Sequence, residues 1–245
     1  ILSSKYEVLT TPKNYNTTMG VVRTIRENLK PIHQVFICEM GATNIGDIKE
    51  ICDIVKPKIG IITAIGPQHL ESFKTIDNII KTKLELANSV AENGGVTFLN
   101  YSNEYLEKEP IKGKFVIYGI NNEKLDYNSY NLKSSSKGIS FTTLYKKTKE
   151  EINFKTKLIG KHNVINITAA ISVADYLEVP LNKMIRAVRE IESVEHRLKP
   201  ILNGKMTIID DSYNSNPVSF KSALDTLLEF EGNKIVVTPR IDRIG

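Results

Sequence analysis

Apolar residues in the first 120 positions follow two patterns, short unbroken runs and longer stripes with helical spacing. The unbroken runs predict buried strands, because parallel strands covered on both faces show no polar alternation, and the stripes predict helices. In chain order, these are a helix at 16–30 ended by Pro31, a strand at 34–38, a helix at 46–55, a strand at 58–65, a helix at 76–92, and strands at 96–100 and 114–119. This alternation predicts an α/β fold with a parallel-rich sheet flanked by helices.

The pattern changes after residue 120. Residues 121–158 are rich in Lys, Ser, Thr and Asn and alternate in polarity, which predicts a small section of antiparallel strands with one wet face. A helix that is apolar nearly all round follows at 160–179, and another begins after Pro180. A strand, a polar loop, a helix and a strand then follow Arg197, at 206–210, 211–217, 218–230 and 234–239. We therefore predict one domain at 1–198 and the start of a second, Rossmann-like α/β domain at 199–245.

Two polar side chains follow predicted buried strands directly. Glu39 ends the run at 34–38, and His69 follows the run at 58–65. Ligands bind at the carboxyl edge of open parallel sheets, so a carboxylate and an imidazole there suit a divalent cation. The alternative is that Glu39 caps a loop and His69 packs against its neighbours, and spacing alone does not separate the two interpretations.

Lys83 lies in the middle of the apolar stripe of the helix at 76–92, with Lys81 and Glu85 expected on the opposite face, toward water. One interpretation is that its stem covers apolar surface while the ammonium reaches water. The other is a desolvated lysine with a lowered pKa, whose neutral amine captures CO2 and becomes a carbamate able to hold a metal. In that case Glu39, His69 and Lys83 would meet around one cation.

Further polar clusters lie at the start of the helix at 160–179 and around Arg197. His162, Asn163 and Asn166 begin the helix; Asn163 is a candidate N-cap, and Asn166, inside an apolar helix, is expected to need a partner. A helix N-terminus with free amides suits an anion or a purine edge. Arg197 stands at the predicted domain junction, and Asp210 and Asp211 end a predicted buried strand. A salt bridge for Arg197 and Asx turns in the loop are the structural alternatives.

The amino-acid composition limits the classes of molecule that this chain is expected to bind and the compartment in which it is expected to lie. The formal net charge is +5 with a pI near 9.0, which favours anionic partners, but the lysines are scattered and do not form one basic helix. No apolar stretch is long enough to cross a bilayer, so no membrane insertion is expected. Cys38 and Cys52 lie among aliphatic residues and are interpreted as reduced core residues of a cytoplasmic protein.

Seven short segments, taken together, resemble Mur ligases, most closely the MurF type, which adds D-alanyl-D-alanine to UDP-N-acetylmuramoyl-tripeptide. The segments are TTPKNYNT, EMGATNIGDI, TAIGPQHLESF, IIKTKLEL, GKHNVINITAA, HRL and DDSYNSNP, within residues 8–239. The resemblance implies a cytoplasmic, ATP-dependent amide-bond ligase acting through an acyl phosphate, with ATP and two Mg²⁺ ions. It implies a monomer whose partners are the muramoyl-tripeptide and D-alanyl-D-alanine, not nucleic acid.

The resemblance also implies roles for individual residues. Glu39, His69 and Lys83, the last as a carbamate, correspond to the catalytic magnesium ligands. The ATP-binding positions are His162, Asn163, Asn166, Arg197 and Asp211. The positions facing the muramoyl-peptide or lining the cleft are Asn16, Thr17, Asn214 and Asn216.

One family motif is missing from this sequence. The ATP site of the family needs a Gly-rich loop ending in Gly-Lys-Ser/Thr, and none occurs here; GKHN at 160–163 has His in place of Ser or Thr. In the family this loop precedes the TTPKNYNT region, so Ile1 would follow it, and the UDP-recognising domain and most of the third domain would also lie outside these residues. We therefore expect a truncated chain that alone neither hydrolyses ATP nor ligates.

Three rival functions stay open at this point. The first is another ligase of this kind, of the MurE type or similar to folylpolyglutamate synthase. The second is a non-catalytic, Mur-like binding module. A nucleic-acid binder, which would rest on the pI alone, is the third.

Overall fold

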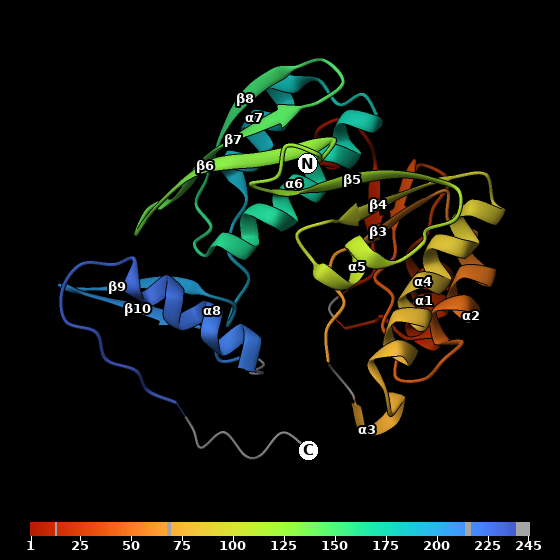
Figure 1. The fold of residues 1–245 in the computed structure, drawn as a ribbon, viewed down its shortest axis with the longest axis horizontal. Helices are drawn as coiled ribbons and strands as arrows, with labels where there is room; N and C mark the ends of the chain where they lie inside the picture. The colour runs from red at the N-terminus through yellow and green to blue at the C-terminus, as the bar shows by residue number, and fades with distance from the viewer. Residues whose placement is uncertain (13, 68–69, 214–216, 239–245) are drawn as a thin grey trace. The chain divides into compact units, whose positions relative to one another are not determined.

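The protein is described from a computed structural model, which covers residues 1–12, 14–67, 70–213 and 217–238 (Figure 1). The chain divides into two compact units. The first unit comprises residues 1–118 and 172–179, and the second comprises residues 119–171 and the chain from 180 onward. The predicted domains at 1–198 and 199–245 stay a prediction.

The first unit alternates strands and helices, as predicted. Its elements are the 3-10 helix Leu2–Ser4, β1 (Val8–Thr10), α1 (Thr18–Asn28), β2 (Val35–Ile37), α2 (Asp47–Val55), β3 (Ile59–Ile62), α3 (Leu70–Phe73), α4 (Ile76–Glu92), β4 (Val96–Asn100), α5 (Glu104–Lys108) and most of β5 (Lys114–Ile120). β1 pairs with β2, β3 with β4, and β4 with β5, all parallel. The α/β class with parallel strands is therefore confirmed.

The helical stripes bury the faces that their spacing predicts. On α4, Ile79, Ile80 and Ala87 join a core cluster with Ile62 of β3 and Leu99 of β4. On α2, the buried residues are Ile48, Ile51 and Cys52, whereas Ile45, which has the sequence spacing of the same stripe, is 58% exposed. Ile45 precedes the N-cap Gly46 and so lies off the helical face.

Strands β2 and β3 are less buried than their sequences predict. β2 has no fully buried residue, and in β3 only Gly60 and Ile62 are buried. Ile37 is 43% exposed and Ile61 is 37% exposed. Each of these strands has one strand neighbour in the described chain, β1 for β2 and β4 for β3.

The second unit contains the predicted antiparallel section. β6 (Tyr127–Ser135), β7 (Gly138–Tyr145) and β8 (Glu150–Thr156) pair in order, and they lie side by side in Figure 1. β8 alternates buried and exposed residues from Ile152 on, whereas β7, between two partners, buries residues on both faces. The predicted wet face is therefore confirmed for the outer strand and is wrong for the central one.

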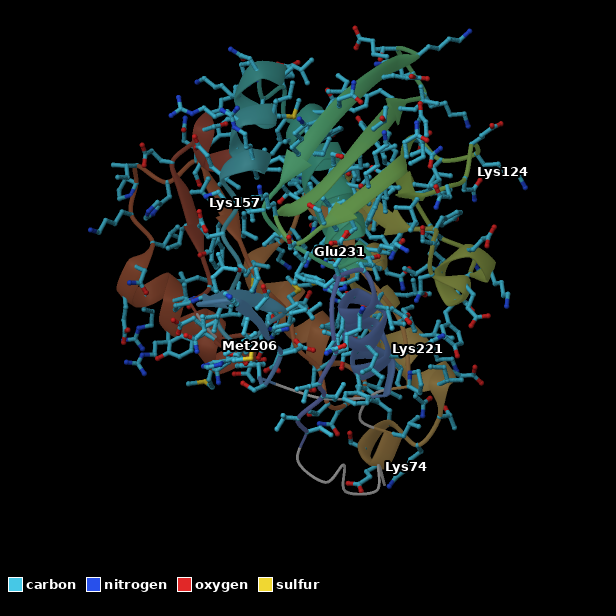
Figure 2. All side chains as sticks on the ribbon, turned by 90° about the vertical axis from the view of Figure 1, so that its left-hand side faces the viewer. Lys74, Lys124, Lys157, Met206, Lys221 and Glu231 are labelled. Atoms are coloured by element: carbon cyan, nitrogen blue, oxygen red, sulfur yellow. The ribbon has the colours of Figure 1, made fainter. Side chains whose placement is uncertain are left out.

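The rest of the second unit comprises α6 (Lys161–Tyr176, whose last turn belongs to the first unit), α7 (Leu181–Glu190), β9 (Lys199–Asn203), β10 (Met206–Asp210) and α8 (Pro217–Leu228). β9 was not predicted, and it forms an antiparallel hairpin with β10. The expected burial of β10 is wrong: Met206, labelled in Figure 2, and Ile208 are both exposed. Residues 234–238 form no strand, because no described strand pairs with them. A strand gains its hydrogen bonds and burial only from neighbours.

Candidate functional site

The first candidate cluster lies where β2 ends. Glu39 follows β2 and is exposed, and its backbone N–H donates to Thr11 Oγ1 at 3.1 Å. Its carboxylate accepts a hydrogen bond from Asn16 Nδ2 at 3.4 Å. The structure therefore brings two predicted site residues, Asn16 and Glu39, together from positions 23 apart in the sequence.

The start of α1 fixes the Asn16 loop. Thr17 is the N-cap of α1, and its Oγ1 accepts the N–H of Gly20 at 3.3 Å. The helix therefore begins at Thr18, two residues later than predicted. The Asn16 carbonyl accepts the N–H of Gly41 at 2.7 Å. A Cβ at Gly41 would lie 2.9 Å from Asn16 Cγ, so a larger residue at this position would displace the Asn16 side chain.

Lys83 lies on α4, half-buried, and lines the same cavity as Glu39. Burial lowers the pKa of the Lys83 ammonium, and the negative charge of Glu39 partly opposes that shift. Within the described residues, Lys83 Nζ has no hydrogen bond or ion pair. This arrangement favours the desolvated lysine over a stem that reaches freely into water.

Glu85, two positions further along α4, differs from the prediction. Lys81 is exposed as expected, but Glu85 is half-buried. Its carboxylate accepts the N–H of Gly46 at 2.8 Å and the N–H of Lys49 at 2.9 Å. Glu85 thus satisfies free amides at the N-terminus of α2, where Gly46 supplies no side-chain cap. The prediction that Glu85 faces water is wrong, because the packing of α2 on α4 replaces the solvent there.

Some predicted residues lie outside the described chain. These are His69, Asn214 and Asn216. Among the residues that the structure describes, no group of three His, Cys, Asp or Glu side chains is placed to hold a metal ion. The metal role of His69 therefore stays a prediction. Cys38 and Cys52 are free thiols, half-buried and buried respectively.

The second candidate cluster lies at the start of α6, in the second unit. His162 Nδ1 lies 3.0 Å from Ser222 Oγ of α8. Burial lowers the pKa of His162, and the charge of Asp211 partly opposes the shift. Electrostatics thus link His162 and Asp211, two predicted ATP-site residues. Ser222 carried no signal in the sequence, since serines are common on exposed helices.

The two asparagines of α6 differ from what the sequence predicted, which was an N-cap at Asn163 and a buried Asn166 with a hydrogen-bond partner. Asn163 is the third residue of the helix, so it is not the N-cap, and its Nδ2 donates to the Ile159 carbonyl at 2.7 Å. Asn166 is exposed and needs no protein partner, because it lies on a part of α6 that the unit leaves uncovered. Its amide is therefore available to a ligand.

Arg197 and Asp211 lie around a tightly held turn. The Arg197 guanidinium lies 4.5 Å from the ring centroid of Tyr213, so a cation–π contact replaces the salt bridge that was the structural alternative. Asp211 Oδ1 accepts the N–H of Leu198 at 3.1 Å. His196, which begins the HRL segment but was not among the predicted site residues, has a positive φ of 62° and places Nδ1 2.8 Å from Asp210 Oδ2. Its place in that segment was the available signal in the sequence.

The lysines are spread along the sequence and do not gather in one segment. Figure 2 labels Lys74, Lys124, Lys157 and Lys221, which are all exposed and come from four separate segments. In the part of the chain that the structure describes, no helix is long and apolar enough to span a membrane.

The family follows from comparison with known proteins. The family model of the Mur ligase middle domain matches residues 1–174. This chain belongs to the Mur ligase family. The predicted resemblance to Mur ligases is therefore confirmed.

Three relatives of this Mur ligase chain are informative. The UDP-N-acetylmuramoyl-tripeptide–D-alanyl-D-alanine ligase of Haemophilus influenzae is 28% identical over 97% of this chain and 51% of its own length. The UDP-N-acetylmuramoyl-L-alanyl-D-glutamate–2,6-diaminopimelate ligase of Chlamydia muridarum is 32% identical, over 73% of this chain and 37% of its own length. The crystal structure of MurF ligase from Thermotoga maritima in complex with ADP has a TM-score of 0.84 at 25% identity, covering 94% of this chain and 53% of that one. The chain thus spans about half the length of the MurF relatives it matches.

Proposed function

We propose that this Mur ligase chain forms part of an ATP-dependent amide-bond ligase that adds D-alanyl-D-alanine to UDP-N-acetylmuramoyl-tripeptide in peptidoglycan synthesis. The observation that carries the proposal is that Glu39 and the partly desolvated Lys83 line one cavity, where the charge of Glu39 acts on the Lys83 amine. The UDP-N-acetylmuramoyl-tripeptide–D-alanyl-D-alanine ligase of Haemophilus influenzae matches 97% of the chain, against 73% for the diaminopimelate ligase of Chlamydia muridarum, which favours the first activity. The free cysteines favour a reducing, cytoplasmic compartment, and we propose a monomer from the family resemblance alone.

The proposed reaction has two steps. The terminal carboxylate of the tripeptide takes the γ-phosphoryl group of ATP, giving an acyl phosphate and ADP. The amine of D-alanyl-D-alanine then attacks the acyl carbon, the bond from that carbon to the phosphate oxygen breaks, and phosphate and one proton leave. Bound Mg²⁺ would offset the charge on the phosphate oxygens.

Glu39, His69 and Lys83 are the proposed Mg²⁺ ligands. The Glu39 carboxylate is exposed and, among the described residues, accepts one hydrogen bond, from Asn16, so it retains free lone pairs for a hard cation. The lowered pKa of Lys83 favours the neutral amine, which adds to CO2 with loss of one proton to give a carbamate. Carboxylate and carbamate oxygens are donors that suit Mg²⁺, so these residues fit two ions in the complete enzyme.

The remaining residues are proposed to bind the two larger substrates. His162, Asn163, Asn166, Arg197 and Asp211 would contact ATP. The free Asn166 amide suits hydrogen bonding to a nucleotide, and the Tyr213 ring holds Arg197 in place. The positions proposed to face the muramoyl-peptide or line the cleft are Asn16, Thr17, Asn214 and Asn216.

The 245 residues alone are expected to be inactive. Their sequence contains no Gly-rich loop ending in Gly-Lys-Ser/Thr to hold the ATP phosphates. Mixing the purified chain with ATP, Mg²⁺ and muramoyl-tripeptide should release no phosphate above the blank. Release above the blank would contradict this expectation.

The activity itself is tested on the longest polypeptide that the gene encodes around these residues. Product formation from ATP, UDP-N-acetylmuramoyl-tripeptide and D-alanyl-D-alanine is followed by mass spectrometry. Glu39→Gln should lower kcat by about 10–100-fold, the usual effect of disturbing a metal site. Glu104→Gln, which changes an exposed carboxylate of α5, serves as the matched control and should leave kcat unchanged.

Two results would overturn the proposal. One is ligation of diaminopimelate to the muramoyl-dipeptide in place of D-alanyl-D-alanine ligation, which would establish the MurE-type activity. The other is equal activity of Glu39→Gln and Glu104→Gln, which would remove Glu39 from the site.

A further inference from the structure

Most of the net charge of the chain comes from the antiparallel section. Residues 121–158, which form β6, β7, β8 and the turns beside them, contain eight lysines, no arginine and four acidic residues, a formal charge of +4 in a chain of +5. Lysines occur along the whole chain, but outside this section acidic residues nearly balance the basic ones. All eight lysines of the section are exposed: Lys124, Lys133, Lys137, Lys146, Lys147, Lys149, Lys155 and Lys157, the first and last of which Figure 2 labels.

Helix α6 covers one face of this antiparallel section. Ser129 Oγ of β6 lies 2.8 Å from Thr143 Oγ1 of β7 and 2.6 Å from Thr168 Oγ1 of α6, and all three side chains are buried. Successive side chains of a strand point to opposite faces of the sheet. Ser140 lies three positions before Thr143 on β7, so its side chain points away from α6.

Two lysines flank Ser140 on the face that points away from α6. Lys133 of β6 and Lys155 of β8 are its cross-strand partners, and directly opposed residues direct their side chains to the same face. Since neighbouring strands lie about 4.8 Å apart, these two lysines extend from backbone positions about 10 Å apart. Lys137, in the turn from β6 to β7, and Lys157, just after β8, lie at the same end of the sheet. These four lysines are called the lysine cluster.

The positive charge of the lysine cluster is mostly uncompensated. Among the described residues, Lys133, Lys137 and Lys155 form no ion pair, and Lys157 pairs with Glu192. Like charges about 10 Å apart still repel one another at about 0.1 M salt, where the Debye length is about 10 Å. An anionic partner would replace this repulsion with attraction.

The side chains of the antiparallel section favour a surface of spread negative charge over other anionic partners. Its basic residues are all lysines, which act as hydrated point charges, whereas arginine supplies the planar fork that binds one phosphate or base edge in two places. Single-stranded nucleic acids stack on exposed aromatic rings, but none of the five aromatic side chains in 121–158 is exposed. A membrane leaflet with anionic lipids presents negative charge that is spread over a surface.

We propose that the lysine cluster binds the surface of a membrane leaflet that contains anionic lipids. Each lysine near such a surface raises the affinity about fivefold, so the four together give weak, reversible association. No large hydrophobic side chain within 121–158 is strongly exposed, so the binding is electrostatic and inserts nothing into the hydrocarbon. This inference goes beyond the proposed ligase activity and does not depend on it.

The test is flotation of the 245-residue chain with lipid vesicles in a density gradient. Phosphatidylcholine vesicles with about 30% phosphatidylglycerol should carry the chain upward at about 0.1 M NaCl, and vesicles of phosphatidylcholine alone should not. About 1 M NaCl, which shortens the Debye length to about 3 Å, should release the chain. Acetylation by an N-hydroxysuccinimide ester, measured by mass spectrometry, should slow at Lys133, Lys137 and Lys155 when anionic vesicles are bound and stay unchanged at Lys221.

A matched pair of double variants places the binding on the lysine cluster. Lys133→Glu with Lys155→Glu should lower the affinity for anionic vesicles at least about 25-fold, because two attractions are lost. Lys81→Glu with Lys221→Glu reverses two exposed lysines of α4 and α8 and should float nearly as the unaltered chain does. Each double variant lowers the formal net charge from +5 to +1, since each reversal changes it by two. Circular dichroism confirms that both are folded.

Four results would overturn the inference. They are no flotation with anionic vesicles, flotation that about 1 M NaCl leaves unchanged, equal flotation of the two double variants, or tighter binding of an oligonucleotide than of vesicles at the same salt, which would make nucleic acid the partner. The assay contains no ATP or muramoyl-peptide, so its failure would leave the proposed ligase activity standing. Failure of the ligase assay would likewise leave the lysine cluster standing.

Discussion

Removal of the Glu85 carboxylate should loosen α2 selectively. Glu85 accepts the backbone N–H groups of Gly46 and Lys49 at 2.8 and 2.9 Å, and no other side chain is seen to cap this helix start. Hydrogen bonds to a charged acceptor contribute about 1.5–3 kcal/mol each, but water can reach the partly exposed amides that Glu85→Ala would leave. We therefore expect a total loss of about 2 kcal/mol, similar to the loss of a strong N-cap.

Native-state hydrogen exchange measures this loss locally. A change of about 2 kcal/mol corresponds to roughly thirtyfold faster exchange of the α2 amides, because 1.4 kcal/mol is a factor of ten. Glu85→Gln keeps one acceptor oxygen and should lose about 1 kcal/mol. Glu92→Ala, at an exposed position of the same helix, is the control and should change exchange little. If α2 exchanges at the same rate in Glu85→Ala and Glu92→Ala, the capping role is refuted.

Three further outcomes follow from the same contacts. Gly138 has a φ of +118°, and a Cβ there would lie 1.9 Å from the Thr156 carbonyl oxygen. Gly138→Ala should therefore lower the free energy of unfolding in urea by about 2–3 kcal/mol, against about 1 kcal/mol for Gly204→Ala, which has open space around it. Equal losses in the two variants would refute the steric reasoning. Because burial lowers the pKa of His162 below its usual 6.5, the folded state binds the proton less readily than the unfolded state, so this contribution to stability is complete above pH 6.5 and falls as the pH drops toward the lowered pKa. NMR titration should show the low pKa, and His162→Gln should flatten this part of the dependence of stability on pH. An unchanged pH dependence of stability in His162→Gln would contradict the assignment. Exposure of the chain to ¹³CO2 at mildly alkaline pH should give, besides any signal from the N-terminal amine, a carbamate NMR signal that disappears in Lys83→Ala and persists in Lys81→Ala. Persistence of that signal in Lys83→Ala would place the carbamate elsewhere.

The local pattern of apolar and polar residues was sufficient to predict most of the helices and strands. Helical spacing identified α2 and α4, and the caps Thr17 and Thr75 are visible in the sequence as hydroxyl residues before amphipathic runs. Apolar runs identified β3 and β4, and alternation identified the antiparallel section. These features are readable because helix and strand periodicities are properties of neighbouring residues.

The sequence also contained the family resemblance and the pairing of Glu39 with Lys83 as a hypothesis, because the seven segments occur in order. It did not reveal that Glu85 caps α2, that Asn166 is exposed, or that β9 pairs with β10. These depend on which elements pack together, and no local pattern carries that information. The apolar runs of β2 and β3 predicted full burial, but the neighbours of a strand in the sheet determine how far it is buried. Only the tertiary structure showed that residues of β2 and β3 line one cavity together with Lys83.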